Sequence, residues 1–431
     1  MILRFKKVFV LAACFLAIIS SLTSCDIDRP TESEESGDLS AQTAMTKEYT
    51  RLNYDYMKAV WLTQYDMQPV YTSGGKQRDK EEFIELASAV LDRVGADGFN
   101  TVIIQVRPFG DSFYPSTVYP ASSVVTGSYG IAMEYDPFDI LVQLAHERSL
   151  SVHAWINPFR LMRTEELEKI SPDYALRRWY DGQERGSVIV EIDGRWYLNP
   201  ACEEARQLIA DGVTELAENY DIDGLHMDDY FYPTTDEGFD ADEYASYKDG
   251  DGELELADWR RSNVDETVSM IYSAVKAVSD DISVGVSPAG NIDNTYSQLY
   301  ADVYRWCAVE GYLDYICPQI YFGLEHETHD FVSVYRRWSV VASSGKAKLA
   351  VGMTLGKAVS GYDGYAGSGC YEWAQHDDII RRCLEFLSQQ RDCTGVAFFC
   401  YQYMYDPTTG EDVAATRAER DNALPVLESL G

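Results

Sequence analysis

Eight short apolar runs, separated by stretches with helical periodicity, constrain the fold more than any other feature of this sequence. They predict β-strands at residues 59–62, 101–106, 151–156, 222–227, 282–286, 315–320, 349–353 and 395–400. Between the third and fourth runs, Ala205, Ile209, Val213 and Leu216 recur every three or four residues, which predicts an amphipathic helix. Strands that are apolar throughout indicate a parallel sheet covered by helices.

Eight such strand and helix units favour a closed α/β barrel, the TIM (β/α)8 fold, with extended strand-to-helix loops. The length after residue 50, about 380 residues, is usual for a barrel of this kind. The alternative is a doubly wound sheet, which requires a glycine-rich phosphate turn after its first strand. Residues 63–66 read Thr-Gln-Tyr-Asp and do not form such a turn. We therefore predict one barrel over residues 51–431.

The first 50 residues predict an export signal and a tether. Arg4, Lys6 and Lys7 precede an apolar run that ends in small residues before Cys25. The segment Leu-Thr-Ser-Cys at 22–25 resembles the lipobox of bacterial lipoproteins, so residues 1–25 are expected to be a lipoprotein signal peptide and Cys25 the lipidated residue. Residues 26–50 are polar and acidic, as in a flexible tether. We expect an exported protein that is lipid-anchored to a bacterial membrane, facing the periplasm or the cell exterior.

Composition argues against several partners. Asp and Glu number 70 against 36 Lys and Arg, which gives a formal net charge of −34. Such a charge repels nucleic acid and anionic lipid, so we expect no nucleic acid partner and membrane contact through the lipid anchor only. The cysteines after Cys25 are odd in number and form no CxxC pair, and no HExxH motif is present. We therefore predict buried thiols, no metal and no cofactor.

Residues 223–233, Asp-Gly-Leu-His-Met-Asp-Asp-Tyr-Phe-Tyr-Pro, place two adjacent carboxylates where the fourth predicted strand ends. An isolated carboxylate is costly in an apolar medium, so Asp228 and Asp229 need a polar cavity. In a barrel that cavity lies at the carboxyl ends of the strands, where active sites are found. Alternatively, both acids cap the next helix or bind a neighbouring arginine.

Polar and aromatic side chains follow the other predicted strands and are expected to share this cavity. The candidate substrate-binding residues are Trp61, Gln105, Arg107, Trp155, Asn157, Arg160, Tyr230, Asn291, Gln319, Tyr321 and Tyr401. Aromatic rings stack on the apolar faces of sugars, and amides and carboxylates bind their hydroxyl groups, so this mixture suits a carbohydrate. Each of these residues could equally have a structural role at the mouth of the barrel.

Several long segments carry a family resemblance. They are MKAVWLTQYD from Met57, GFNTVIIQVRPFGDSFYPS from Gly98, SVHAWINPFR from Ser151, WYLNP from Trp196, DIDGLHMDDYFYP from Asp221, VGVSPAGN from Val284 and DYICPQIYFG from Asp314. In sequence and order they resemble the glycosyl hydrolase-like 10 (DUF187) lipoproteins. The resemblance implies a TIM barrel and a cell-envelope glycosidase that cleaves O-glycosidic bonds, with members acting on peptidoglycan glycan strands that have few or no peptides.

A glycosidase needs one carboxylic acid and one carboxylate, and we assign the carboxylate role, nucleophile or base, to Asp228. Adjacent residues on a strand point to opposite faces, so the acid is expected elsewhere, with Glu325 as first candidate and Asp229 as second. The motif also resembles that of chitinase-type enzymes, in which the acetamide of the substrate is the nucleophile, although Tyr230 occupies the position of their glutamate. The alternative function is a non-catalytic glycan-binding surface lipoprotein.

Overall fold

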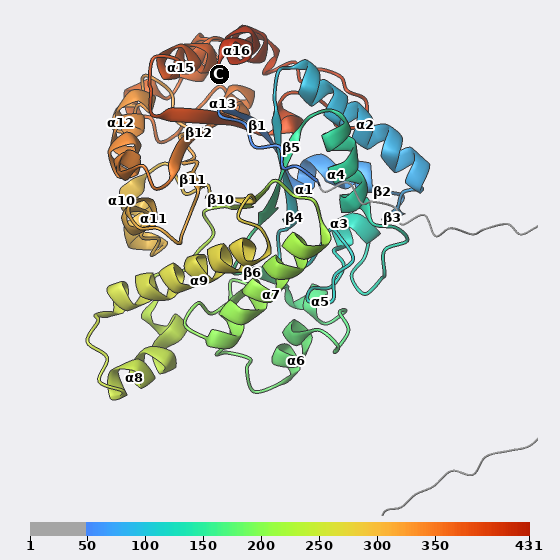
Figure 1. Ribbon diagram of the computed structural model, residues 1–431. Helices are drawn as coiled ribbons and strands as arrows, with labels where there is room; N and C mark the ends of the chain where they lie inside the picture. The colour runs from blue at the N-terminus through green and yellow to red at the C-terminus, as the bar shows by residue number, and fades with distance from the viewer. Residues whose placement is uncertain (1–48) are drawn as a thin grey trace, which may run out of the picture. The chain divides into compact units, whose positions relative to one another are not determined.

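The computed structural model describes residues 49–431, in which eight parallel strands close into a barrel in the order β1-β13-β12-β11-β10-β9-β5-β4 (Figure 1). The strands are β1 Met57–Leu62, β4 Thr101–Arg107, β5 Ser151–Ile156, β9 Gly224–Met227, β10 Ser283–Val286, β11 Tyr315–Ile316, β12 Lys348–Thr354 and β13 Cys393–Phe399. Each overlaps one predicted run, so the predicted TIM barrel is confirmed. The predicted signal peptide and Cys25 lie outside the described residues.

Helices surround the barrel and form its outer layer (Figure 1). They are α1 Gln64–Tyr71, α2 Lys80–Ala96, α3 Ser123–Thr126, α4 Pro137–Glu147, α5 Thr164–Leu167, α6 Ala175–Asp181, α7 Glu203–Asn219, α8 Ala241–Asp249, α9 Leu256–Val278, α10 Ile292–Gln298, α11 Val303–Ala308, α12 Phe331–Val341, α13 Gly356–Ser360, α14 Glu372–Gln375, α15 Ile379–Leu387 and α16 Arg417–Ser429. The predicted helix before β9 is α7, which buries Ala205, Ile209, Val213 and Leu216 as its periodicity requires.

Two small antiparallel sheets extend the loops. One pairs β2 Thr72–Ser73 with β3 Lys76–Gln77, and the other has the order β6-β8-β7, with β6 Arg160–Arg163, β7 Ile189–Ile192 and β8 Arg195–Leu198. The second sheet lies in the connection between β5 and α7, beyond the carboxyl end of β5. It therefore adds structure at the end of the barrel where active sites are found.

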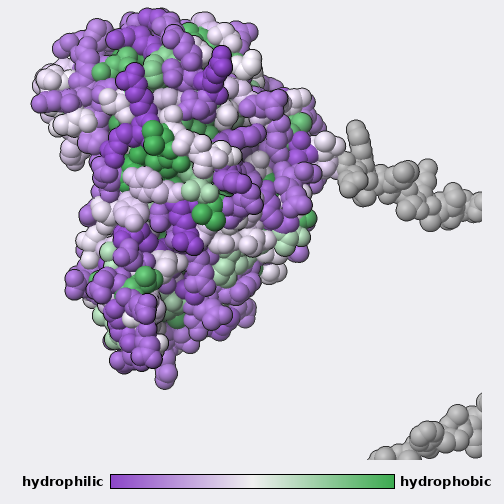
Figure 2. Space-filling model, turned by 60° about the vertical axis from the view of Figure 1, so that its left-hand side comes forward, coloured by the Kyte–Doolittle hydropathy of each residue, from purple (hydrophilic) through white to green (hydrophobic). Residues whose placement is uncertain are grey.

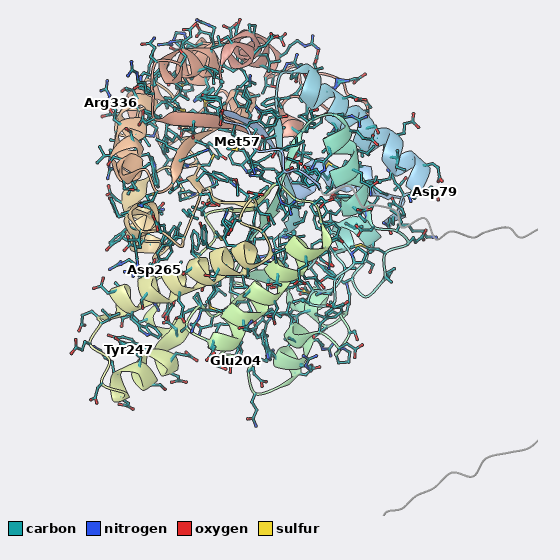
Figure 3. All side chains as sticks on the ribbon, in the orientation of Figure 1. Met57, Asp79, Glu204, Tyr247, Asp265 and Arg336 are labelled. Atoms are coloured by element: carbon teal, nitrogen blue, oxygen red, sulfur yellow. The ribbon has the colours of Figure 1, made fainter. Side chains whose placement is uncertain are left out.

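Side chains alternate between two cores, as strand geometry requires. Val60 and Val152 point outward and pack under the helices, whereas Ala59, Ile103 and Ala397 point inward and fill the barrel. Figure 3 shows the barrel filled with side chains, with Met57 toward its centre. The face shown in Figure 2 is mainly hydrophilic with small apolar patches, in keeping with the acidic composition.

The interior of the barrel holds a buried chain of polar aromatic rings. Trp61 Nε1 donates to His226 Nε2 at 3.4 Å, so the proton of the neutral His226 ring is on Nδ1 and is donated to the Tyr315 hydroxyl oxygen at 2.8 Å. The Tyr315 hydroxyl in turn donates to His153 Nδ1 at 2.8 Å. Burial lowers the pKa of both histidines, that of His153 to about 4, so both rings are neutral.

Glycine makes room for these rings. A Cβ atom at Gly285 would lie 2.0 Å from the Tyr315 ring, and one at Gly224 would lie 2.6 Å from the His153 ring. Both distances are shorter than any real carbon contact, so a side chain at either position would displace a ring. The interior of the barrel is therefore a packed core and leaves no channel.

The amino-terminal end of the barrel is tied to the start of the described chain. Asp223, which directly precedes β9, accepts hydrogen bonds from the Tyr49 hydroxyl at 2.7 Å and from Leu52 N, and its second oxygen accepts from Val152 N at 2.8 Å. His146 Nε2 lies 3.0 Å from the same carboxylate, and the His146 ring stacks on Tyr49. The compact unit therefore begins at Tyr49, two residues ahead of the predicted boundary at 51.

Within residues 49–431, no helix combines the length and the apolarity needed to cross a membrane. The cysteines of this part of the chain are all free thiols, and all except Cys370 are buried. The expectation of buried thiols in place of a disulfide framework is confirmed for these residues.

Candidate active site

A pocket of about 620 Å³, open to solvent, lies at the carboxyl ends of the strands. It is lined by Thr63, Gln64, Tyr65, Gln105, Trp155, Asn157, Arg160, Asp228, Asp229, Tyr230, Gln319 and Phe399. A separate cavity at the amino-terminal ends of the strands, next to His153, contains neither member of the carboxylate pair. The chemistry expected of the chain is therefore concentrated in the first pocket.

Asp228 is held by a chain of N–H donors that begins at the first residue of α1. Gln64 N donates to Gln105 Oε1 at 2.9 Å, Gln105 Nε2 donates to Asn157 Oδ1 at 2.9 Å, and Asn157 Nδ2 donates to Asp228 Oδ2. Asp228 Oδ1 accepts from Tyr230 N at 3.2 Å. Both carboxylate oxygens therefore face fixed N–H donors, and the side chain is oriented before any ligand binds.

Asp229 lies in the same pocket, which corrects the expectation that the two acids point apart. β9 ends at Met227, and Phe231 N donates to Asp229 O at 3.1 Å, so the chain turns at this point and no longer alternates its side chains. Gln319 Nε2 donates to Asp229 Oδ1 at 3.2 Å. Asp229 is half-buried, whereas Asp228 is only 3% exposed. The pocket therefore offers one enclosed and one more accessible carboxyl group.

The two acids make each other harder to ionise. Burial raises the pKa of Asp228 well above its ordinary value, and the charge of Asp229 raises it further. Burial also raises the pKa of Asp229, against the effects of the Gln319 hydrogen bond and the Arg160 charge. Two interacting carboxyl groups titrate as a pair, so this pair holds one proton at a pH where an ordinary aspartic acid has lost it.

Glu325, the first candidate for the acid, does not line the pocket. Its side chain is exposed, and Oε1 lies 3.7 Å from His376 Nε2. The backbone N of Glu325 donates to Glu372 at 3.0 Å, which ties this loop to α14. Among the residues that line the pocket, Asp228 and Asp229 are the only carboxylic acids. The second candidate, Asp229, is therefore the acid that the geometry supplies.

Aromatic and cationic side chains form the wall beside the acids. Trp155 is buried at the pocket beside Asp228, and a hydrogen bond from its side chain counteracts part of the rise in the pKa of Asp228. Arg160 Cζ lies 4.2 Å from the Tyr230 ring centroid, and Tyr230 is 46% exposed. Tyr65, which lines the pocket from α1, is 65% exposed. Two accessible rings are thus available to a ligand.

Six predicted binding residues come together in this pocket: Gln105, Trp155, Asn157, Arg160, Tyr230 and Gln319. Tyr321 does not line the pocket and packs on Phe399, which does, at 5.8 Å between ring centroids. Trp61 is in the barrel interior, where it donates to His226, and does not reach the pocket.

Three predicted residues have other roles. Arg107 follows a register shift after Gln105, which turns its side chain outward, where its guanidinium stacks on Tyr119 at 4.5 Å. Asn291 caps α10 and accepts hydrogen bonds from the backbone N atoms of residues 293 and 294. Tyr401 is 1% exposed and packs against Tyr405. These three placements correct the expectation that the residues line the pocket.

Sequence reasoning missed three lining residues: Thr63, Tyr65 and Phe399. The Thr63 hydroxyl accepts from Tyr65 N and Asp66 N at 3.2 Å, and Asp66 accepts from Thr63 N, which together form a capping box at the start of α1. The spacing of Thr63 and Asp66 was visible in the sequence and could have located this turn at the mouth of the barrel. Phe399 lies inside a predicted strand, and only the barrel geometry shows which way it points.

Within residues 49–431, no group of three or more His, Cys, Asp or Glu side chains is arranged to hold a metal ion. The candidate site is therefore built from carboxyl groups, amides and aromatic rings, with Arg160 as the cation that lines it.

An eight-stranded parallel barrel with a carboxylate pair at its mouth belongs to the TIM-barrel class, in which active sites occupy this end. The chain belongs to the glycosyl hydrolase-like 10 family, whose model matches residues 56–361. The predicted family is thereby confirmed.

Curated relatives carry hydrolase names. The chain is 32% identical over 324 residues to "Glycosyl hydrolase YngK" of Bacillus subtilis, in an alignment that covers 71% of this chain and 60% of that protein. It is 26% identical over 390 residues to "Glycosyl hydrolase DigH" of Escherichia coli K12, covering 83% of this chain and 86% of that protein. The chain thus spans about 60% of the length of the Bacillus relative.

Solved structures support the fold. The glycoside hydrolase domain of PgaB (BpsB) from Bordetella bronchiseptica superposes with a TM-score of 0.56 at 14% identity, covering 85% of this chain and 98% of that domain. The catalytic domain of a β-amylase from Paenibacillus polymyxa gives a TM-score of 0.54 at 10% identity, with 86% and 98% covered. At these identities the likeness concerns the fold alone.

Proposed function

We propose that this protein is a glycoside hydrolase of the cell envelope that cleaves O-glycosidic bonds in peptidoglycan glycan strands with few or no peptides. The observation that carries the proposal is the pairing of Asp228 and Asp229 in one pocket with rings and amides that suit a sugar. The family membership and the hydrolase names of the relatives support the same reaction class.

The adjacency of the acids determines the mechanism that we propose. Hydrolysis by two carboxyl groups places them on opposite sides of the scissile bond, about 5–9.5 Å apart, whereas Asp228 and Asp229 come from a single turn after β9. An acetamide group on C2 of the substrate supplies the missing nucleophile from the substrate itself. Peptidoglycan sugars carry such acetamides, so the pair and this substrate are matched chemically.

The environments of the acids suggest how they divide the work. Asp228 receives N–H donors from Asn157 and Tyr230 on its two oxygens, which favours a carboxylate acceptor that orients the acetamide N–H. Asp229 is the more accessible acid, so it can donate a proton to the departing oxygen and recover one from water. When the acetamide N–H binds Asp228, the proton shared by the pair moves to Asp229.

Mass spectrometry of the products tests this function. Wild-type protein incubated with peptide-free glycan strands should release saccharides with new reducing ends, and intact peptidoglycan should give fewer. The identity of the new reducing end names the bond. If no saccharide is released while the protein still co-sediments with the strands, the alternative of a non-catalytic glycan-binding lipoprotein replaces the hydrolase.

Location in the envelope has a separate test. The predicted lipidation at Cys25 implies that wild-type protein fractionates with membranes although its barrel contains no membrane-spanning helix within residues 49–431. Cys25→Ser should move the protein to the soluble fraction of the same cells. Retention of this variant in the membrane fraction would refute the lipid anchor and leave the proposed reaction unaffected.

A further inference from the structure

Arg160 has no carboxylate partner although it lines the acidic pocket. It is the first residue of β6, and its guanidinium packs between two rings, 4.2 Å from the Tyr230 centroid and 5.0 Å from the Phe109 centroid. None of the ion pairs formed within residues 49–431 includes Arg160, and its buried Nε has no acceptor there. Arg160 thus lines the pocket with a guanidinium that forms no ion pair within the described residues, and its charge lowers the pKa of Asp228 and Asp229.

A second arginine increases the positive charge. Arg195 Cζ lies 4.2 Å from the centroid of Phe109, the ring that Arg160 also contacts. Burial lowers the pKa of Arg195, and the nearby charge of Arg160 lowers it further. Arg195 Nη1 donates to Leu161 O at 2.8 Å, so a backbone carbonyl, with no formal charge, is its partner. The two cations repel each other, and an anion bound at Arg160 would relieve that repulsion.

The Tyr230 and Phe109 rings fix the orientation of the Arg160 guanidinium before a ligand binds. A guanidinium stacked between aromatic faces keeps its N–H edge available for a planar, two-oxygen partner. A carboxylate has that shape, and it brings one negative charge. A phosphate would bring up to two negative charges beside Asp228 and Asp229, which the pocket disfavours.

We propose that Arg160 binds a free carboxylate carried by the sugar in the pocket, with Arg195 as a positioning residue behind it. The inference rests on the proposed hydrolase function and adds a rule of specificity to it. Two sources share this chemistry. One is the lactyl ether of a muramoyl residue, whose carboxyl group is free only after the peptide has been removed, and the other is a uronic acid.

The experiment compares substrates that differ only in this carboxylate. Peptide-free glycan strands are used as such and after conversion of their lactyl carboxyl groups to methylamides, and hyaluronan oligosaccharides supply uronate beside 2-acetamido sugars. Wild-type protein should cleave the free-acid strands with a kcat/KM at least about tenfold above that for the amidated strands. In Arg160→Gln this ratio should fall to about one.

Arg163→Gln is the matched control, because Arg163 is the last residue of the same strand, is exposed and does not line the pocket. It should keep the wild-type ratio. A ratio is used because Arg160 also lowers the pKa of both acids, an effect common to the two substrates. Cleavage of hyaluronan oligosaccharides with the same dependence on Arg160 would name uronate as the source.

Two failures are distinguishable. If wild-type protein cleaves free-acid and amidated strands equally, or if Arg160→Gln keeps the wild-type ratio, the carboxylate site is refuted and the hydrolase stands. If nothing is cleaved, the hydrolase fails, and calorimetric binding of the two kinds of strand to wild-type and Arg160→Gln protein decides the carboxylate site by the same ratio. Thermal melting of the variant, expected within a few degrees of wild type, excludes unfolding as the cause.

Discussion

The two ends of β9 each carry a buried aspartate, and the surroundings of the two differ. Asp223, ahead of the strand, is 0% exposed and receives donors from Tyr49, Leu52 and Val152. Asp228, just after the strand, is 3% exposed and faces another carboxylate. The carboxylate of Asp223 is stabilised by hydrogen-bond donors of the protein. The ionised form of Asp228 is destabilised by burial and by the charge of Asp229.

The difference between Asp223 and Asp228 indicates which end of the barrel carries the functional site. A buried carboxylate with a full set of donors contributes to the fold, because removing it leaves those donors unpaired. A buried carboxylate beside a second acid lowers stability. Such groups are found mainly at functional sites, where ligand binding or catalysis requires them. The same contrast separates Arg160, which forms no ion pair within residues 49–431, from the neutral chain of His153, Tyr315 and His226 in the barrel interior.

Removing the satisfied aspartate should have the largest effect on stability. Asp223→Ala removes the acceptor of two backbone N–H groups and leaves the Tyr49 hydroxyl with His146 Nε2 as its partner, and we expect a loss of about 3–5 kcal/mol in the free energy of unfolding. Urea denaturation followed by circular dichroism measures it. Asp221→Ala, an exposed neighbour, is the control and should stay within about 0.5 kcal/mol of wild type. Equal losses in the two variants would remove the contrast between the strand ends.

Removing the conflicted aspartate should have the opposite sign. The folded-state pKa of Asp228 is raised, so its contribution to stability is present below the unfolded-state pKa and is lost as the pH rises through the folded-state value. Relative to wild type, Asp228→Asn should therefore gain stability as the pH rises above the unfolded-state pKa, and the gain should level off above the folded-state pKa. Thermal melts across this range provide the measurement. A difference that does not change with pH would show that the charge of Asp228 is not strained.

The pair should also set the pH dependence of activity. Since the pair must hold one proton to act, kcat/KM should fall as the pH rises through its pKa, which burial raises above the ordinary range of an aspartic acid. Rates on peptide-free strands between pH 3 and pH 9 give the profile. An alkaline limb at about pH 4 would mean that neither acid is perturbed.

The smallest effect is expected at Glu325, outside the pocket. Glu325→Gln removes an exposed carboxylate 3.7 Å from His376 and should change kcat/KM less than about twofold. A fall of more than about a hundredfold would show that this loop supplies the acid after all.

The sequence predicted the barrel because each strand is apolar on both faces, a property of the local residues that the fold preserves. It also located Asp228 and Asp229, since active sites of these barrels lie at the carboxyl ends of the strands and both acids follow a strand. The prediction failed where a one-residue shift in the backbone decides which way a side chain points. The register shift after Gln105 turns Arg107 outward, and the turn after Met227 brings Asp229 inward. Asn291 is the N-cap of α10 and does not line the pocket. Capping depends on the residue at which a helix starts, and hydrophobic periodicity does not fix that residue.

The most direct test of the acid pair is the hydrolysis of peptide-free glycan strands by Asp228→Asn, Asp229→Asn and the double variant, each shown by thermal melting to be folded. We predict that each single change lowers kcat/KM by at least about a hundredfold, and that the double variant is scarcely worse than the poorer single variant, since the two act as a unit. Single variants that stay within about tenfold of wild type, or a double variant whose loss is the product of the two single losses, would contradict the pair.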